Sequence, residues 1–164
     1  MTMTDSALPF SGESTEEAAT DVLVRIGERI EFATRYTRED ISRFATFTLD
    51  NNPVHHDREA ARCAGLHDVI ASGQHTSALM SGLAATYFSR SDDGIARAML
   101  CLNFNFAYRE PIFAETDVAM EWMVTDTEWS LSLDGVIAQL EGKATAGGAS
   151  AVVARGTVLV RRAC

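Results

Sequence analysis

The sequence has too few cysteines and too few basic residues for several common classes of protein. Its 164 residues include three cysteines, Cys63, Cys101 and Cys164, and no two of them are close together. An odd number of widely spaced thiols is typical of a reducing compartment and does not match the paired spacing of a zinc site. Fourteen basic residues stand against 23 acidic ones, for a formal net charge of -9. Because phosphate binding needs clustered Lys and Arg, this balance argues against a nucleic-acid partner.

A long hydrophobic run and a signal peptide are also missing. No apolar stretch approaches the roughly 18 residues that a membrane-spanning helix needs, and the N-terminus lacks a basic start followed by an apolar run. We therefore predict a cytoplasmic protein with no membrane partner. Residues 1–20 contain four acidic residues, no basic residue and little apolar periodicity. They are predicted to form a flexible acidic tail before a single domain at 21–164.

Two periodicities divide the domain. An extended segment at 22–36 precedes the first half, in which apolar residues recur at helical spacing. From residue 98 onward the apolar residues alternate, which is typical of strands that bury one face. Helices are predicted over 37–50, 57–66 and 74–88, and strands over 100–108, 117–125, 135–144 and 150–162. This order predicts an α+β fold in which the long helix lies on one face of an antiparallel sheet.

The stretch LDNNPVHHD, which follows the first predicted helix, contains the densest group of reactive side chains. Pro53 fixes one backbone dihedral and Asn52 tolerates turn conformations, so the loop is predicted to aim Asp50 and His55 at one point. A carboxylate and an imidazole that share a water form a general acid/base pair, which contributes about 10²- to 10⁴-fold in rate. A turn capped by Asp50, with a partly exposed His55, explains the same residues. His56 is expected to point the other way, towards solvent or a partner chain.

The motif TLDNNPVHHDREAARCAG, followed by IASGQHTSALMSGL, resembles the MaoC-like, (R)-specific enoyl-CoA hydratase family. The signature of that family runs Asp-x-Asn-Pro-x-His and continues to a Gly that opens the central helix. The similarity extends through NFAYREPIFAETDV and the closing ARGTVLVRR, so it covers the chain from 22 to 162. It implies a hot-dog fold, in which a curved antiparallel sheet wraps a long helix, and pairing into a homodimer or a dimer-based oligomer.

The resemblance also implies a reaction and roles for individual residues. Asp50 and His55 would activate a water for (R)-specific hydration of a 2-enoyl-CoA, or for the reverse dehydration of a 3-hydroxyacyl thioester. Gly73 would place a backbone N–H at the thioester oxygen, a donor worth roughly 3 to 4 kcal/mol. Asn52 would hold the loop or orient the water, and Ser81, which matches a serine of the family's helix, would hold the loop or touch substrate. Because CoA or a carrier protein is part of the substrate, we expect no separate cofactor and no metal.

Three positions around Gly73 concern the acyl group. Ser72 stands where the family often has a His, and Gln74 and His75 place polar groups in the first turn of a mostly buried helix. Gln74 and His75 either cap the helix or contact a partner chain, or they line a pocket for a polar acyl group, and with Ser72 they are candidate substrate-binding residues. Two other functions stay open. One is a hot-dog acyl-CoA thioesterase, which the intact loop disfavours, and the other is a non-catalytic acyl-binding subunit of a hetero-oligomer.

Overall fold

The structure of the protein is a computed structural model that describes residue 20 and residues 23–163. The acidic tail predicted over 1–20 lies outside the described residues, except for Thr20. No helix in the described part of the chain has both the length and the apolar character needed to cross a membrane. The elements follow in the order β1 (Arg29–Tyr36), α2 (Arg38–Phe47), the 3₁₀ turn η1 (Pro53–His55), α3 (Arg58–Cys63), α4 (Gly73–Phe88), β2 (Arg97–Tyr108), β3 (Thr116–Ser130), β4 (Gly135–Ala146) and β5 (Ala149–Arg162).

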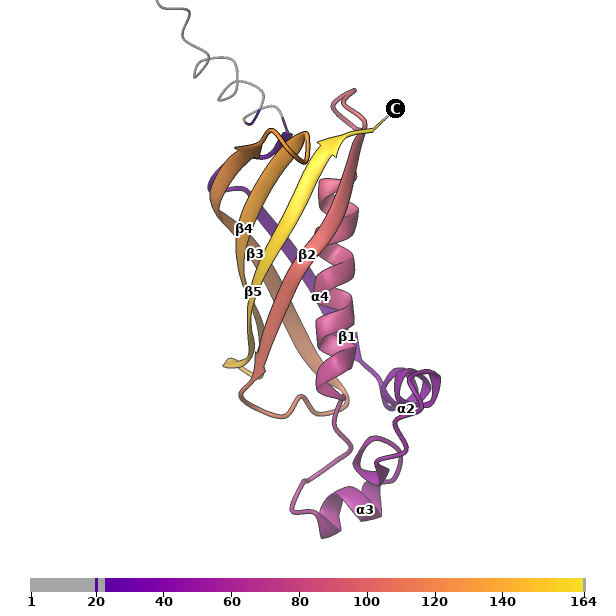
Figure 1. Cartoon of the computed structure of the whole chain (residues 1–164). Coiled ribbons are helices and arrows are strands. Elements are labelled where there is room, and N and C mark those ends of the chain that lie inside the picture. Colours follow the sequence, from indigo (N-terminus) through magenta and orange to yellow (C-terminus); the bar gives the residue numbers. More distant parts are fainter. Residues whose placement is uncertain (1–19, 21–22, 164) are drawn as a thin grey trace, which may run out of the picture.

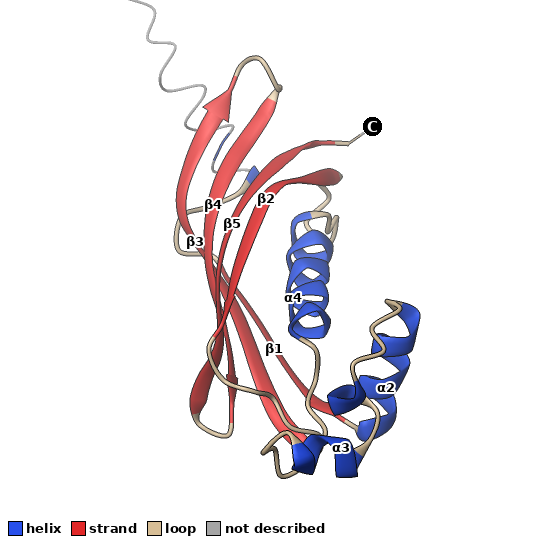
Figure 2. Cartoon of the chain, turned by 60° about the horizontal axis from the view of Figure 1, so that its bottom comes forward, coloured by secondary structure: helices blue, strands red, loops and turns tan. Residues whose placement is uncertain are grey.

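One antiparallel sheet contains all five strands, in the order β1-β3-β4-β5-β2. The sheet curves around α4, and β1 and β2 are its outer strands (Figure 1). Figure 2 shows α2 and α3 near the N-terminal end of α4. The α+β arrangement predicted from the two periodicities is therefore confirmed. It places the loop between α2 and α3 near the first turn of the long helix.

The core lies between α4 and the concave face of the sheet. The alternation predicted for β3 is present, because Val118, Met120, Trp122 and Val124 are all 1–2% exposed. The indole N–H of Trp122 donates to the carbonyl oxygen of Met80 in α4 over 2.8 Å, so the helix and the sheet are joined by a buried polar contact. Gly142 pairs with Trp122 across the strands, and a Cβ at Gly142 would come 2.5 Å from the indole ring. A glycine is needed there to let the large ring pack flat against β4.

Side-chain caps begin the helices at the predicted places. Thr37 and Asp40 form a reciprocal capping box at the start of α2. Asp57 accepts hydrogen bonds from the second and third N–H groups of α3. Ser72 caps α4 by accepting from the N–H of His75. Each cap satisfies donors that the helix itself leaves open, so the three helices start where polar residues precede apolar ones.

The structure interrupts the alternation predicted for β2. A bulge between Cys101 and Asn103 inserts Leu102 as an extra residue in the pairing with β5. Leu100 and Leu102 are 44% and 48% exposed, whereas Phe104 packs against the core. The bulge changes the side that the strand presents to the helix, so the two leucines lie on the exposed part of an outer strand.

The spacing of Ile41, Phe44 and Phe47 in the sequence predicts one apolar face for α2, but the buried face is narrower. Ile41 is buried, but Phe47 is 85% exposed. A repeat of three residues turns a helix by 300°, so it drifts by about 60° at each step and places Phe47 about 120° from Ile41. The buried face follows the four-residue spacing from Ile41 to Ala45 instead.

Candidate active site

The loop after α2 is held by its own backbone. Leu49 has a φ of 60°, a left-handed conformation that costs a non-glycine residue about 1 kcal/mol. Directly after it, the N–H of Asp50 donates to the carbonyl of Ala45 over 2.8 Å. The N–H of Asn52 donates to Oδ1 of Asp50 over 3.1 Å, and Oδ1 of Asn52 accepts from the N–H of Val54. One oxygen of Asp50 is therefore used to shape the turn, and the other is left to face His55.

Asp50 and His55 converge as the motif predicted. Oδ2 of Asp50 lies 3.4 Å from Nε2 of His55. On the other side of the ring, Nδ1 of His55 lies 2.7 Å from the carbonyl oxygen of Ile70. A carbonyl only accepts, so Nδ1 carries the proton, and in the neutral ring Nε2 presents its lone pair on the side of Asp50. The distance of 3.4 Å is too long for a strong direct hydrogen bond, so both groups are free to bind one water.

Burial differs between the two groups. The His55 side chain is 8% exposed and the Asp50 side chain is 31% exposed. The imidazole is therefore fixed inside the fold, while the carboxylate borders the surface. Because Nδ1 is already bonded to backbone, only the Nε2 edge of His55 is available for chemistry. The arrangement can take a proton from a water and return one to a neighbouring carbon.

His56 is exposed, as expected, but both nitrogens of its ring are hydrogen-bonded. Nε2 of His56 donates to the backbone carbonyl of Asp50 over 2.9 Å. With that nitrogen protonated, Nδ1 accepts a hydrogen bond of 3.0 Å from the hydroxyl of Ser42 in α2. The two adjacent histidines therefore have separate tasks, since His55 faces Asp50 and His56 ties the loop to α2. The sequence analysis missed Ser42, which lies eight residues before Asp50 and belongs to no recognisable motif.

A cavity of about 290 Å³ lies beside Gly73, the first residue of α4. The first N–H groups of a helix lack intrahelical partners and carry its positive end, so they suit a developing negative charge. Ile70 links this cavity to the pair formed by Asp50 and His55, since it belongs to the lining and its carbonyl orients His55. The lining consists of Ile70, Ala71, Ser72, Gly73, Thr76, Tyr108, Arg109, Glu110, Pro111, Ile112 and Val152.

Tyr108 forms one wall of this cavity. Its ring lies so close to Gly73 that a Cβ there would be 2.7 Å from the ring carbons. Its hydroxyl lies 2.6 Å from that of Ser77, which in turn donates to the carbonyl of Gly73 over 3.1 Å. Since the proton of Ser77 is used, Tyr108 is the donor of the pair. The sequence analysis missed Tyr108 and Ser77, and the only available signal was the place of Tyr108 at the end of a strand before Pro111.

The other predicted site residues on or next to α4 lie in different environments. Ser72 is 5% exposed and caps α4. Gln74 is exposed to solvent. Ser81 donates to the carbonyl of Ser77 over 2.7 Å, so its hydroxyl is bonded within the helix. Of these three residues, the structure brings Ser72 alone to the cavity lining.

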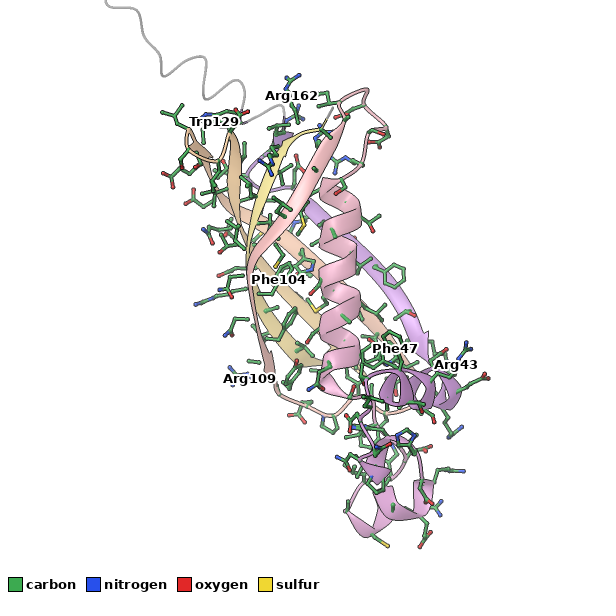
Figure 3. The ribbon with its side chains drawn as sticks, turned by 45° about the vertical axis from the view of Figure 1, so that its right-hand side comes forward. Arg43, Phe47, Phe104, Arg109, Trp129 and Arg162 are labelled. Carbon is green, nitrogen blue, oxygen red and sulfur yellow. The ribbon has the colours of Figure 1, made fainter. Side chains whose placement is uncertain are left out.

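His75 points to a different place. Its ring is stacked between Tyr36 and Phe44, with centroid distances of 4.5 and 4.4 Å. Burial lowers the pKa of His75, partly opposed by the charge of Asp40. The residue borders a groove of about 580 Å³ between β1, α2 and α4, and not the cavity at Gly73. Figure 3 shows Phe47, another residue of this groove, on α2 beside α4.

Comparison with known proteins identifies one family to which the chain is similar. Residues 21–141 match the family model described as MaoC like domain. Among curated proteins, a 3-hydroxyacyl-[acyl-carrier-protein] dehydratase named FERN, mitochondrial, of Solanum lycopersicum is 30% identical over 71 residues. That match spans 43% of this chain and 43% of the relative, which is less than half of either protein.

Solved structures of (R)-hydratases have the same fold. The (R)-hydratase from A. caviae involved in PHA biosynthesis superposes with a TM-score of 0.70 at 24% identity, covering 82% of this chain and 96% of the other. The R-hydratase PhaJ1 from Pseudomonas aeruginosa superposes with a TM-score of 0.73 at 19% identity, covering 88% and 87%. At these identities the likeness concerns the fold, and it agrees with the predicted hot-dog arrangement.

Proposed function

This chain belongs to the MaoC like domain family, and from that premise we propose that it is a hydro-lyase that acts on acyl thioesters. In one direction it adds water (R)-specifically across the double bond of a 2-enoyl thioester, and in the other it dehydrates a 3-hydroxyacyl thioester. The observation that carries the proposal is the pair formed by Asp50 and His55, with 3.4 Å between Oδ2 and Nε2. The pair is assembled within a single chain and held from both sides by backbone.

The proposed chemistry uses three groups of this chain. Asp50 and His55 bind the water, take one proton from it as its oxygen bonds to C3, and return one proton to C2. The pair therefore ends the cycle in its starting state. Electron density that leaves the double bond accumulates on the thioester oxygen, and the N-terminal N–H groups of α4, with Gly73 first, stabilise it. A single donor of this kind is worth roughly 3 to 4 kcal/mol in the transition state.

The same site supports a proposal for the substrate class. The cavity beside Gly73 holds about 290 Å³, which is near the lower end of the usual range for ligand pockets. We therefore propose short enoyl groups as the acyl portion. CoA and an acyl carrier protein both present the acyl group as a thioester. The name of the Solanum lycopersicum relative mentions the carrier-protein form. Either carrier is treated as part of the substrate, with no separate cofactor.

The outer strand β2 supports a homodimer. It is 12 residues long, lies at the edge of the sheet, and exposes Leu100 and Leu102. A long edge strand with apolar side chains is a template for pairing with another chain. We propose that two copies join their β2 strands antiparallel, which would make one continuous sheet. A complete Asp50–His55 pair in each copy supports a homodimer over a non-catalytic subunit that needs a different partner.

The test is an assay of the purified chain with a series of 2-enoyl-CoA and 3-hydroxyacyl-CoA thioesters. We expect loss of the conjugated double bond in one direction, its formation in the other, and an (R)-configured hydroxyl product. Free thiol is measured in the same reactions, because its release would indicate a thioesterase instead. Light scattering during size-exclusion chromatography reports the number of chains in the active species. An inactive chain that gains activity only with a different protein would contradict the proposal.

A further inference from the structure

Asp68 joins three segments around the catalytic loop. Asp68 is 7% exposed, and both of its carboxylate oxygens accept hydrogen bonds. Oδ1 lies 3.2 Å from Nε of Arg38 and 3.3 Å from Nε of Arg58, and Oδ2 lies 2.5 Å from a terminal nitrogen of Arg38. Oδ1 also accepts from the N–H of Val69 over 2.8 Å. A planar guanidinium that bonds both carboxylate oxygens fixes direction as well as distance.

The partners of Asp68 lie on the two helices that border the catalytic loop. Arg38 is the first residue of α2, the helix that leads into Asp50. Arg58 is the first residue of α3, which begins three residues after His55. Asp68 itself belongs to the segment that leads into α4. One buried carboxylate therefore connects the segment before the loop, the segment after it and the segment that precedes Gly73.

Ile70, two residues after Asp68, contacts the catalytic loop through both of its backbone groups. Its N–H donates to the carbonyl of Val54 over 3.2 Å, and its carbonyl accepts from Nδ1 of His55 over 2.7 Å. The second bond decides which nitrogen of His55 carries the proton. A shift of Ile70 away from the turn would remove the acceptor from Nδ1, and the proton would be free to occupy Nε2 instead.

We propose that Asp68 is a positioning residue, which through Arg38 and Arg58 holds the Ile70 carbonyl where it selects the Nδ1–H tautomer of His55. Its consequence for the rate rests on the proposed function, but its effect on the tautomer does not. Asp68 does not touch the reacting atoms. It acts on them through the backbone carbonyl of Ile70 and the ring of His55.

The charges make the arrangement sensitive to one substitution. The hydrogen bonds from Arg38 hold the pKa of Asp68 at about 2, so the carboxylate is ionised throughout the working range. Without the charge of Asp68, Arg58 would lose its ion pair with this carboxylate, and Arg38 would keep its ion pair with Glu115 at 3.6 Å but lose its charge-assisted bonds to Asp68. The segment that carries Asp68 would then no longer be tied to α2 and α3 by these bonds, so it is expected to move.

Asp93 offers a matched control. Its carboxylate binds Arg97 through two hydrogen bonds of 2.8 and 2.5 Å, and these bonds lower the pKa of Asp93 strongly. This pair follows the C-terminal end of α4, whereas Gly73 begins it. A helix of 16 residues separates them by about 24 Å. Asp93→Asn therefore breaks the same kind of bond far from the catalytic loop.

The experiment reads the ring nitrogens of His55 by NMR in protein labelled with ¹⁵N-histidine. The chain has four histidines, so the spectrum is simple, and loss of one signal set in His55→Gln identifies the ring. At neutral pH we expect the native protein to show a protonated Nδ1 and a bare Nε2. In Asp68→Asn we expect a mixture with a protonated Nε2 and a kcat lowered about 10- to 100-fold, with a smaller change in KM. Asp93→Asn is expected to retain the native tautomer.

A second variant covers the case in which Asp68→Asn does not fold. Arg38→Lys keeps the positive charge but cannot bond both carboxylate oxygens, and we expect a smaller tautomer shift in the same direction. A native tautomer in folded Asp68→Asn and Arg38→Lys would overturn the proposal, and so would an equal shift in Asp93→Asn. If the tautomer shifts but native protein has no hydration activity, the positioning role stands and the proposed function fails.

Discussion

The ring of Tyr108 lies directly against the backbone of Gly73, at the start of α4. A Cβ at Gly73 would stand 2.7 Å from two ring carbons, well inside normal van der Waals contact. The hydroxyl of the same ring is bonded to Ser77, one turn further along the helix. The proposed oxyanion donors and the wall of the proposed acyl cavity are thus in contact with each other. A change on one side is expected to be felt on the other.

Gly73→Ala is expected to displace the Tyr108 ring and break its hydrogen bond with Ser77. We expect a loss of about 1 kcal/mol in the free energy of unfolding and at least a tenfold decrease in kcat/KM for enoyl-CoA. Gly82→Ala on the same helix is the control, because nothing lies within 4 Å of a Cβ there. That substitution is expected to stabilise the helix by up to about 1 kcal/mol with little effect on activity. Similar behaviour of the two variants would contradict the close contact at Gly73.

Tyr108→Ala is expected to enlarge the cavity beside Gly73. We predict that kcat/KM for longer enoyl groups rises relative to that for short ones, as measured across a series of chain lengths. Tyr108→Phe keeps the ring and removes only the hydroxyl, so its preference for chain length is expected to stay close to native. An unchanged preference in Tyr108→Ala would show that the acyl group lies elsewhere, for example in the groove bordered by His75.

Asp50→Asn and His55→Gln are each expected to lower kcat for hydration by about 10²- to 10⁴-fold. Because the two groups act on one water, the double variant is expected to lose little more than either single variant. Circular dichroism and melting temperature check that each variant is folded. His56→Gln provides the comparison from the same loop, and its effect is expected to be much smaller because His56 contacts only Ser42 and backbone. Full hydration activity in either catalytic variant would exclude the proposed pair.

His75 is expected to make stability depend on pH. Burial holds the pKa of His75 in the folded state below the ordinary histidine value of about 6.5, so the unfolded chain binds the proton more readily. The stability contributed by the neutral ring is therefore present above pH 6.5 and is lost as the pH falls below that value. Chemical denaturation at several pH values measures this slope. In His75→Phe, which keeps an aromatic ring between Tyr36 and Phe44, the slope should decrease. An identical slope in both proteins would show that His75 is not the source of this pH dependence.

Local sequence patterns were sufficient for much of the fold. The change of period near residue 98 marked the passage from helices to strands. The helices predicted to begin at Thr37 and Asp57 do begin there, with these two residues as caps. These predictions succeed because caps and alternating burial depend on near neighbours along the chain. The bulge at Leu102 was not predictable in the same way, because it depends on pairing with the distant strand β5. The exposure of Phe47 follows from helix geometry, since a three-residue spacing leaves Phe47 about 120° from Ile41.

The sequence by itself determined the loop that carries Asp50 and His55, because proline and asparagine restrict the backbone over only a few residues. Only the tertiary structure decided how that loop is held. Ile70 and Asp68 lie 15 and 13 positions after His55 in the sequence. Tyr108 lies in β2, the strand that follows α4. No periodicity or spacing relates such residues to the motif. They meet because packing of α4 against the sheet brings their segments together, and packing acts through space and not along the sequence.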